Sequence, residues 1–209
     1  HDEADYHRNL GEALQASGDV AGFVQEYREE VRLRPDDPDA HAHLANAYQA
    51  AGDLPNSLGE YQVALKLRPL IPEFHFRAAL VLEALGRGPE SRAQLEQAVH
   101  LRPDYAEALV ALGDSLAREK QFALAVPTYR DALRLRSDDP SLHVSLAAAL
   151  RENGDREGAL AEAREAVRLN PSNPDYQREL GNALFTRGDF QGAAEAYRAS
   201  LRQHEDAQT

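Results

Sequence analysis

The residues most able to do chemistry in this sequence are its eight histidines, because imidazole can bind a metal ion or transfer a proton near neutral pH. Four of them, His7, His41, His75 and His143, are separated by 34 residues or by twice that number. The chain has no cysteine, which excludes disulfides, thiolate metal sites and cysteine catalysis. Whether the four rings form a site therefore depends on the elements that carry them.

A period of 34 residues runs through the whole sequence. Prolines mark one position of each period, and glycines mark a turn at another position. The prolines are Pro35, Pro69, Pro103 and Pro171, with Ser137 between the last two, and the glycines are Gly18, Gly52, Gly86, Gly154 and Gly188, with Lys120 in the fourth turn. A fixed period of 20 to 50 residues is typical of repeat arrays. The sequence predicts six repeats, at about 4–37, 38–71, 72–105, 106–139, 140–173 and 174–207, within a single domain over 1–209.

Each repeat is predicted to hold two helices, because its apolar residues are spaced by three and four. A bulky column and a small column lie side by side in the first helix, and we expect large residues to meet small ones. These columns are Leu10, Leu44, Ala78, Leu112, Leu146 and Leu180, and Gly11, Ala45, Ala79, Gly113, Ala147 and Gly181. The glycine turns are expected to be left-handed, a conformation that costs a residue with a Cβ about 1 to 2 kcal/mol.

In such an array the four histidines cannot share a metal ion. Equivalent residues of stacked helices lie about 8 to 10 Å apart, whereas zinc binds nitrogen at about 2.0 to 2.1 Å. We expect the rings to pack between helices, and neutral rings would make the fold weaken as pH falls through the histidine range. Glycines stand singly at turns and carboxylates follow helix caps, so no catalytic residue, metal or cofactor is predicted and the chain is not expected to be an enzyme.

The charge balance restricts the class of partner. Lys and Arg number 23 against 35 Asp and Glu, which gives a net charge of -12. Such a surface repels phosphate backbones and anionic headgroups, so nucleic acid is not an expected partner. No apolar run approaches the roughly 20 residues of a membrane span, so membrane insertion is not expected.

The repeated columns resemble the tetratricopeptide repeat, in which a Leu-Gly pair, a Gly-Asp turn, small residues and a closing proline recur. Leu180-Gly181, Gly188-Asp189 and Ala193 are one instance, and the likeness covers residues 4 to 207. It implies an all-α fold, an α-solenoid of antiparallel helix pairs forming a right-handed superhelix. It also implies that the first helices line a concave groove for partner segments.

Carrying the family's groove columns over gives an apolar centre with a charged rim. The candidate partner-binding residues are Asn46, Leu70, Ile71, Phe76, Arg77, Leu80, Val110, Asp114, Arg118, Val144 and Arg151. Apolar centres with polar rims are typical of interfaces, although these side chains could instead pack on one another. The family's clamp for a terminal carboxylate is poorly kept, because Glu12, His43 and Glu73 accompany Arg8 and Arg77.

These observations predict a scaffold or adaptor that binds a protein or peptide segment with an apolar anchor. The alternative is a substrate-docking or oligomerisation domain of a larger enzyme or assembly protein. The last repeat is expected to lack a polar capping helix, which would leave Tyr197 and Leu201 partly bare and favour self-association through this uncapped C-terminal repeat.

Overall fold

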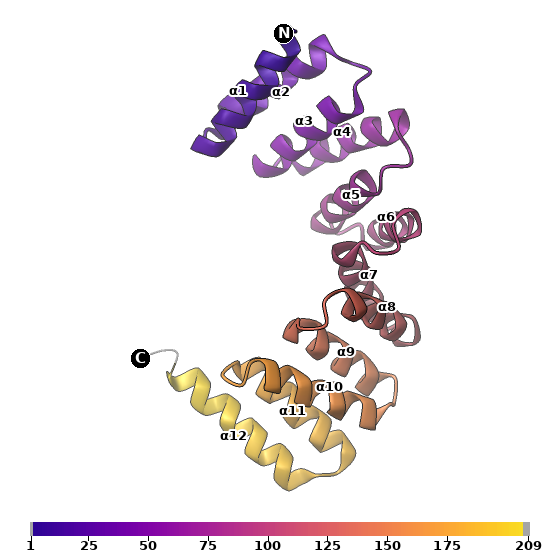
Figure 1. The fold of residues 1–209 in the computed structure, drawn as a ribbon, viewed down its shortest axis with the longest axis vertical. Coiled ribbons are helices and arrows are strands. Elements are labelled where there is room, and N and C mark those ends of the chain that lie inside the picture. The colour runs from indigo at the N-terminus through magenta and orange to yellow at the C-terminus, as the bar shows by residue number, and fades with distance from the viewer. Residues whose placement is uncertain (1, 207–209) are drawn as a thin grey trace. The chain divides into compact units, whose positions relative to one another are not determined.

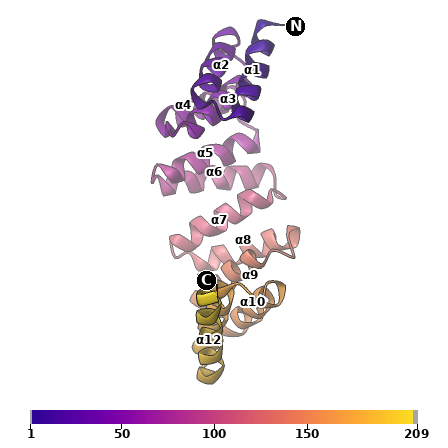
Figure 2. The ribbon, with the colours of Figure 1, turned by 90° about the vertical axis from the view of Figure 1, so that its left-hand side faces the viewer.

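The computed structural model describes the backbone of residues 2–206 and the side chains of residues 2–203. This part of the chain forms helices that follow one another in consecutive antiparallel pairs, two per predicted repeat (Figures 1 and 2). The pairs are α1 (Glu3–Ser17) and α2 (Val20–Leu33), α3 (Pro38–Ala50) and α4 (Leu54–Leu67), α5 (Pro72–Ala84) and α6 (Gly88–Leu101), α7 (Ala106–Arg118) and α8 (Phe122–Leu135), α9 (Pro140–Glu152) and α10 (Arg156–Leu169), and α11 (Pro174–Arg187) and α12 (Phe190–Asp206).

The chain divides into two compact units, each made of three repeats. Unit 1 extends to Pro103 and holds α1 to α6, and unit 2 begins at Asp104 and holds α7 to α12. Within each unit every helix packs on its pair partner, and most second helices also pack on the first helix of the next repeat. The predicted fold class, an all-α solenoid of antiparallel helix pairs, is confirmed. A single domain over the whole chain stays a prediction.

The turns inside the repeats have the predicted left-handed backbone. The five turn glycines have φ angles from 73° to 95°, and Lys120 takes the same region with a φ of 59°. The aspartate after the turn begins the second helix where it is present: Asp19, Asp53 and Asp155 accept hydrogen bonds from backbone amides three residues later. Local sequence therefore sets where the helices end and begin.

Large residues meet small ones inside several of the pairs, as predicted. The ring of Tyr129 on α8 lies against Gly113 on α7, where an added Cβ would be only 2.6 Å from Tyr129 Cε1. The tyrosine hydroxyl donates to Asp114 Oδ1 at 2.7 Å. In repeat 3 the large and the small residue at two positions of the first helix are interchanged. Phe74 and Ala78 stand where repeat 2 has Ala40 and Leu44. All four of these residues are buried, so the exchange keeps the core filled.

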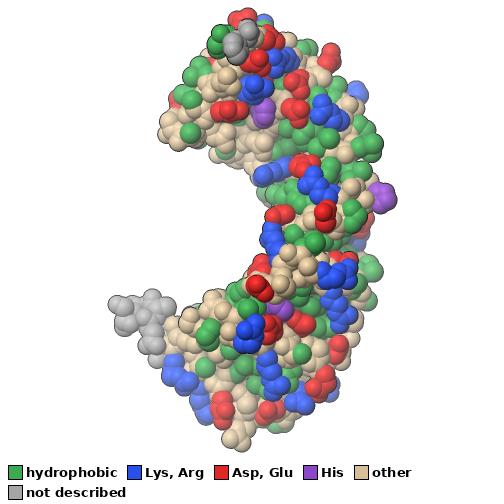
Figure 3. Space-filling view, in the orientation of Figure 1, with side chains coloured by type: hydrophobic (Ala, Val, Ile, Leu, Met, Phe, Trp, Pro, Cys, Tyr) green, Lys and Arg blue, Asp and Glu red, His purple; other side chains and the backbone are tan. Residues whose placement is uncertain are grey.

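The surfaces of both units mix acidic, basic and apolar side chains (Figure 3). A search of the described helices finds none with the length and apolar character that crossing a bilayer requires.

Candidate functional site

A polar pocket lies between the repeats of unit 1. Its volume is about 450 Å³, and side chains of α1, α2, α3 and α5 form its wall. The lining residues are Gln15, Tyr27, His43, Asn46, Gln49, Ala50 and Arg77. The pocket therefore brings together Asn46 and Arg77, two of the predicted groove residues, although they belong to different repeats.

His43 forms one wall of this pocket through a pair with a buried acid. Its Nδ1 lies 3.1 Å from Oε2 of Glu30, whose residue is only 1% exposed. The hydrogen bond to this carboxylate raises the pKa of His43 above its ordinary value, against the effect of burial. The Glu30 carboxylate therefore favours the protonated form of this ring, whose charge is opposite to its own.

The remaining polar wall supplies hydrogen-bond donors. Arg77 is exposed and, among the residues that the structure describes, makes no ion pair or hydrogen bond. The Oδ1 of Asn46 accepts from the Tyr61 hydroxyl at 2.6 Å, which leaves the Asn46 amide nitrogen to donate. Guanidinium, imidazolium and amide groups suit oxygen acceptors, such as the main-chain carbonyls and carboxylates of a peptide.

The apolar residues predicted in unit 1 lie outside this pocket. Phe76 and Leu80 are half-buried on α5. Leu70 is 71% exposed in the link between α4 and α5, and Ile71 packs against the core of unit 1. Ile71 thus serves the fold, in line with the alternative that some of the predicted residues pack internally.

In unit 2 the predicted charged residues are engaged with one another or with neighbouring helices. Asp114 accepts from Tyr129, and Arg118 Nε donates to the Asp114 main-chain carbonyl at 3.3 Å. Arg151 Nε on α9 donates to Oε1 of Glu179 on α11 at 3.2 Å, and Glu179 is 7% exposed. Arg151 therefore joins two successive repeats.

The predicted apolar residues of unit 2 are half-buried. Val110 lies on α7 and Val144 on α9. Burial raises the pKa of the neighbouring Asp114 carboxyl, although its hydrogen bond from Tyr129 opposes the rise.

Two histidines of the column, His41 and His143, have oxygen partners on both ring nitrogens. The Nδ1 of His41 lies 2.6 Å from Glu60 Oε2, and its Nε2 lies 2.9 Å from the Pro35 carbonyl oxygen. His143 repeats this arrangement with Glu162 at 2.6 Å and the Ser137 carbonyl at 3.1 Å. Each of these rings therefore lies between a carboxylate and a main-chain carbonyl.

These contacts join the first helix of a repeat to its second helix and to the end of the preceding repeat. His41 and His143 therefore link neighbouring elements of the fold in addition to packing between helices. No group of three or more metal-binding side chains occurs among the residues that the structure describes.

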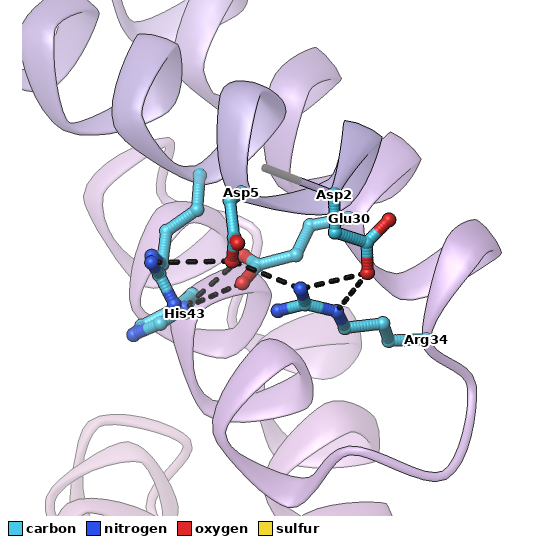
Figure 4. Close-up of polar contacts among 6 residues, drawn as sticks. Asp2, Asp5, Glu30, Arg34 and His43 are labelled. Atoms are coloured by element: carbon cyan, nitrogen blue, oxygen red, sulfur yellow. Dashed lines mark hydrogen bonds and ion pairs between the residues drawn. The ribbon is translucent and has the colours of Figure 1, made fainter.

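The first repeat has a second charged cluster beside the His43 and Glu30 pair (Figure 4). Arg34 Nη2 lies 2.9 Å from Oδ2 of Asp2 and 2.9 Å from Oδ1 of Asp5. Arg8, at a clamp position of the family, pairs with Asp5 at 3.3 Å. Arg8 is therefore already partly neutralised by an acid of its own helix. This internal pair is a further departure from the family's carboxylate clamp, in addition to those predicted from Glu12 and His43.

Sequence reasoning missed most of the pocket wall. Gln15 and Gln49 share one column of the repeat, three positions after the column of Asn46, and His43 and Arg77 share another. Residues three and four apart lie on one helix face, so this spacing was the available signal.

Comparisons with known proteins agree with the geometry of the repeats. The family model described as "Tetratricopeptide repeat" matches residues 43–93, 84–140 and 144–207. No curated protein sequence matches the chain.

Several solved structures have the same fold at low sequence identity. The structure of YrrB, described as a TPR protein with an unusual peptide-binding site, is 19% identical with a TM-score of 0.79, covering 86% of this chain and 93% of its own. MamA from Desulfovibrio magneticus RS-1 is 19% identical with a TM-score of 0.78, covering 82% and 97%. PilF from Pseudomonas aeruginosa is 21% identical with a TM-score of 0.74, covering 99% and 97%. At these identities the likeness concerns the fold.

Proposed function

The chain belongs to the tetratricopeptide repeat family, and on this premise we propose that it is a non-enzymatic scaffold that binds a segment of another protein along the first helices of its repeats. The polar pocket of unit 1 is the observation that carries the proposal. Its donors come from three repeats, which matches an extended ligand that crosses successive helices. The peptide-binding site by which YrrB is described supports the same class of ligand.

The proposed segment contributes oxygen acceptors and at least one apolar anchor. Arg77, protonated His43 and the Asn46 amide would hold main-chain carbonyls or an acidic side chain. Phe76 and Leu80 in unit 1, both half-buried, would supply apolar contact. Removing apolar area from water is favourable by about 25 cal/mol per Å² before the entropic costs of association are subtracted, so such contacts favour binding. Val110 and Val144 are proposed to act in the same way within unit 2.

The test compares capture of partners by the wild-type chain and by two variants with changed grooves. One variant combines Phe76→Asp with Val110→Asp, and the other is Arg77→Glu, whose position is exposed and outside the core. Leu124→Asp is the matched control, because Leu124 is 55% exposed on α8, a second helix.

We expect specific partners, identified by mass spectrometry, to be lost by both groove variants and kept by the control. Circular dichroism must show unchanged helicity, so that loss of capture reports the surface and not unfolding. Undiminished capture by both groove variants would refute binding at this face.

A second candidate function is assembly, and it rests on a different surface. Phe190 and Leu201 on α12 are 63% and 62% exposed, which makes them two of the large apolar side chains exposed on unit 2. We propose that this helix mediates self-association, whether or not the chain also binds a partner segment in its groove.

A further inference from the structure

Apolar side chains of α12 form a stripe along one side of the helix, with Phe190 and Leu201 exposed and Ala194 and Tyr197 half-buried. Phe190, Ala194, Tyr197 and Leu201 are spaced by four, three and four residues, and we call them the tail face. The ring of Phe185 meets that of Phe190 edge to face at a centroid distance of 5.3 Å and extends this apolar surface. Residues at these spacings lie on one side of a helix, so the tail face is a single surface.

Inside unit 1 the equivalent stripe is covered by the next repeat. The residues of α4 that occupy the same four positions are Leu54, Leu58, Tyr61 and Leu65. They belong to or pack against one core cluster, to which α5 contributes Phe74, Ala78, Val81 and Leu82. Tyr61 is 0% exposed and Leu65 is half-buried, whereas their counterparts on α12 are a half-buried Tyr197 and a Leu201 that is 62% exposed. The fold thus shows what kind of helix such a stripe accepts.

The helix α1 presents a matching surface. Its residues at the four covering positions are Tyr6, Leu10, Ala13 and Leu14, which we call the head face. The interior helix α11 has the same four residue types at the same positions, namely Tyr176, Leu180, Ala183 and Leu184, and it packs on α10. In α11 two residues of this set, Ala183 and Leu184, are buried and the other two are half-buried, whereas on α1 three of the four are exposed and Leu14 is half-buried.

Charges beside the two faces have opposite signs. Glu3 and Glu12 on α1 are exposed, and Arg198 and Arg202 on α12 are exposed. Opposite charges at the edges of an apolar contact favour encounter and orientation. One acid, Glu195 on α12, works against this balance.

We propose that two copies of this chain associate head to tail, with the head face of one copy packed on the tail face of the other. The contact continues the stacking that joins successive repeats inside each unit. It is heterologous, so each pair keeps one head face and one tail face for further copies. The inference rests on the self-association proposed above and is independent of the groove.

The experiment uses the 209-residue chain and one blocking variant for each face. Leu10→Asp places a charge in the head face and Leu201→Asp places one in the tail face. Both positions are largely exposed, so folding should survive, and Leu124→Asp again serves as the control. Sedimentation velocity across a concentration series gives the mass distribution of each protein and of an equimolar mixture of the two blocked variants.

We expect wild type and control to form larger species as concentration rises. Each blocked variant alone should dissociate at least about tenfold more readily, because apolar anchors at the centre of an interface dominate affinity. The mixture should form a one-to-one dimer and nothing larger, since it contains one intact head face and one intact tail face.

Three results would overturn the inference, and they identify what failed. A wild-type chain that stays monomeric would mean that the chain does not self-associate and that these faces bind something else. Self-association by Leu10→Asp that is undiminished, with loss only in Leu201→Asp, would indicate contact between two tail faces. Blocked variants that remain monomeric when mixed would exclude head-to-tail pairing. The groove variants should associate as wild type does, so partner capture and self-association can fail separately.

Discussion

The close approach of Tyr129 to Gly113 gives a quantitative prediction for Gly113→Ala. The new Cβ would stand 2.6 Å from Tyr129 Cε1, whereas carbon atoms in contact prefer about 3.5 to 4.0 Å, so the ring must move by roughly 1 Å. Tyr129 is 2% exposed and its hydroxyl is bonded to Asp114, which limits this movement. Overpacking of this kind costs about 1 to 3 kcal/mol.

Repeat 2 already pairs Ala45 with Tyr61, and both are 0% exposed, so the fold can accommodate the combination. We therefore expect the lower half of that range, a cost of about 1 to 2 kcal/mol. Replacing glycine by alanine inside a helix also stabilises the helix by about 1 kcal/mol. This gain in stability must be separated from the packing cost at Gly113.

Gly59→Ala is the control that isolates the packing cost. Gly59 lies inside α4, and an added Cβ there would meet nothing within 4 Å. Urea unfolding followed by circular dichroism should show Gly59→Ala gaining about 0.5 to 1 kcal/mol and Gly113→Ala falling below it by about 1 to 2 kcal/mol. In a Tyr129→Leu background, which removes the ring edge, the cost of adding Gly113→Ala should be smaller than in the wild type. Equal stability of the two alanine variants would refute the packing argument.

Three further predictions follow from single side chains. Lys120→Gly should raise the free energy of unfolding by up to about 1 kcal/mol in urea titrations, because Lys120 has a φ of 59° and glycine relieves the left-handed strain; no gain would contradict this. Pro127→Ala should stabilise the chain by up to about 3 kcal/mol in the same assay, because Pro127 lies inside α8 and removes a backbone donor. Bonding to Glu30 raises the folded pKa of His43, so this pair's stabilisation is complete at low pH and is lost as pH rises through that pKa. The stability difference between wild type and His43→Gln should therefore shrink with rising pH, and a difference that grew with pH would reverse the argument.

The structure brings only some of the predicted site residues together in one pocket, and the reason is visible in unit 1. Asn46 and Arg77 both line the polar pocket. The columns that they occupy in the repeat predict that both lie on the same groove face. Ile71 instead packs in the core, because its place in the link lets it reach the cluster around Leu58. The sequence of a link between helices does not show whether an apolar residue in it faces the solvent or the core. Leu70 beside it is 71% exposed.

The sequence by itself determined the features that depend on neighbours along the chain: the period, the helices, the left-handed turns and the caps. Those features rest on contacts within a few residues, and they recur every 34 positions, so each repeat confirms the next. The tertiary structure alone decided what each side chain meets across helices. It paired His41 with Glu60, closed a pocket from three repeats, and left Leu201 open while its counterpart Leu65 packs on a core. Such contacts depend on how helices pack in three dimensions, which local spacing does not specify.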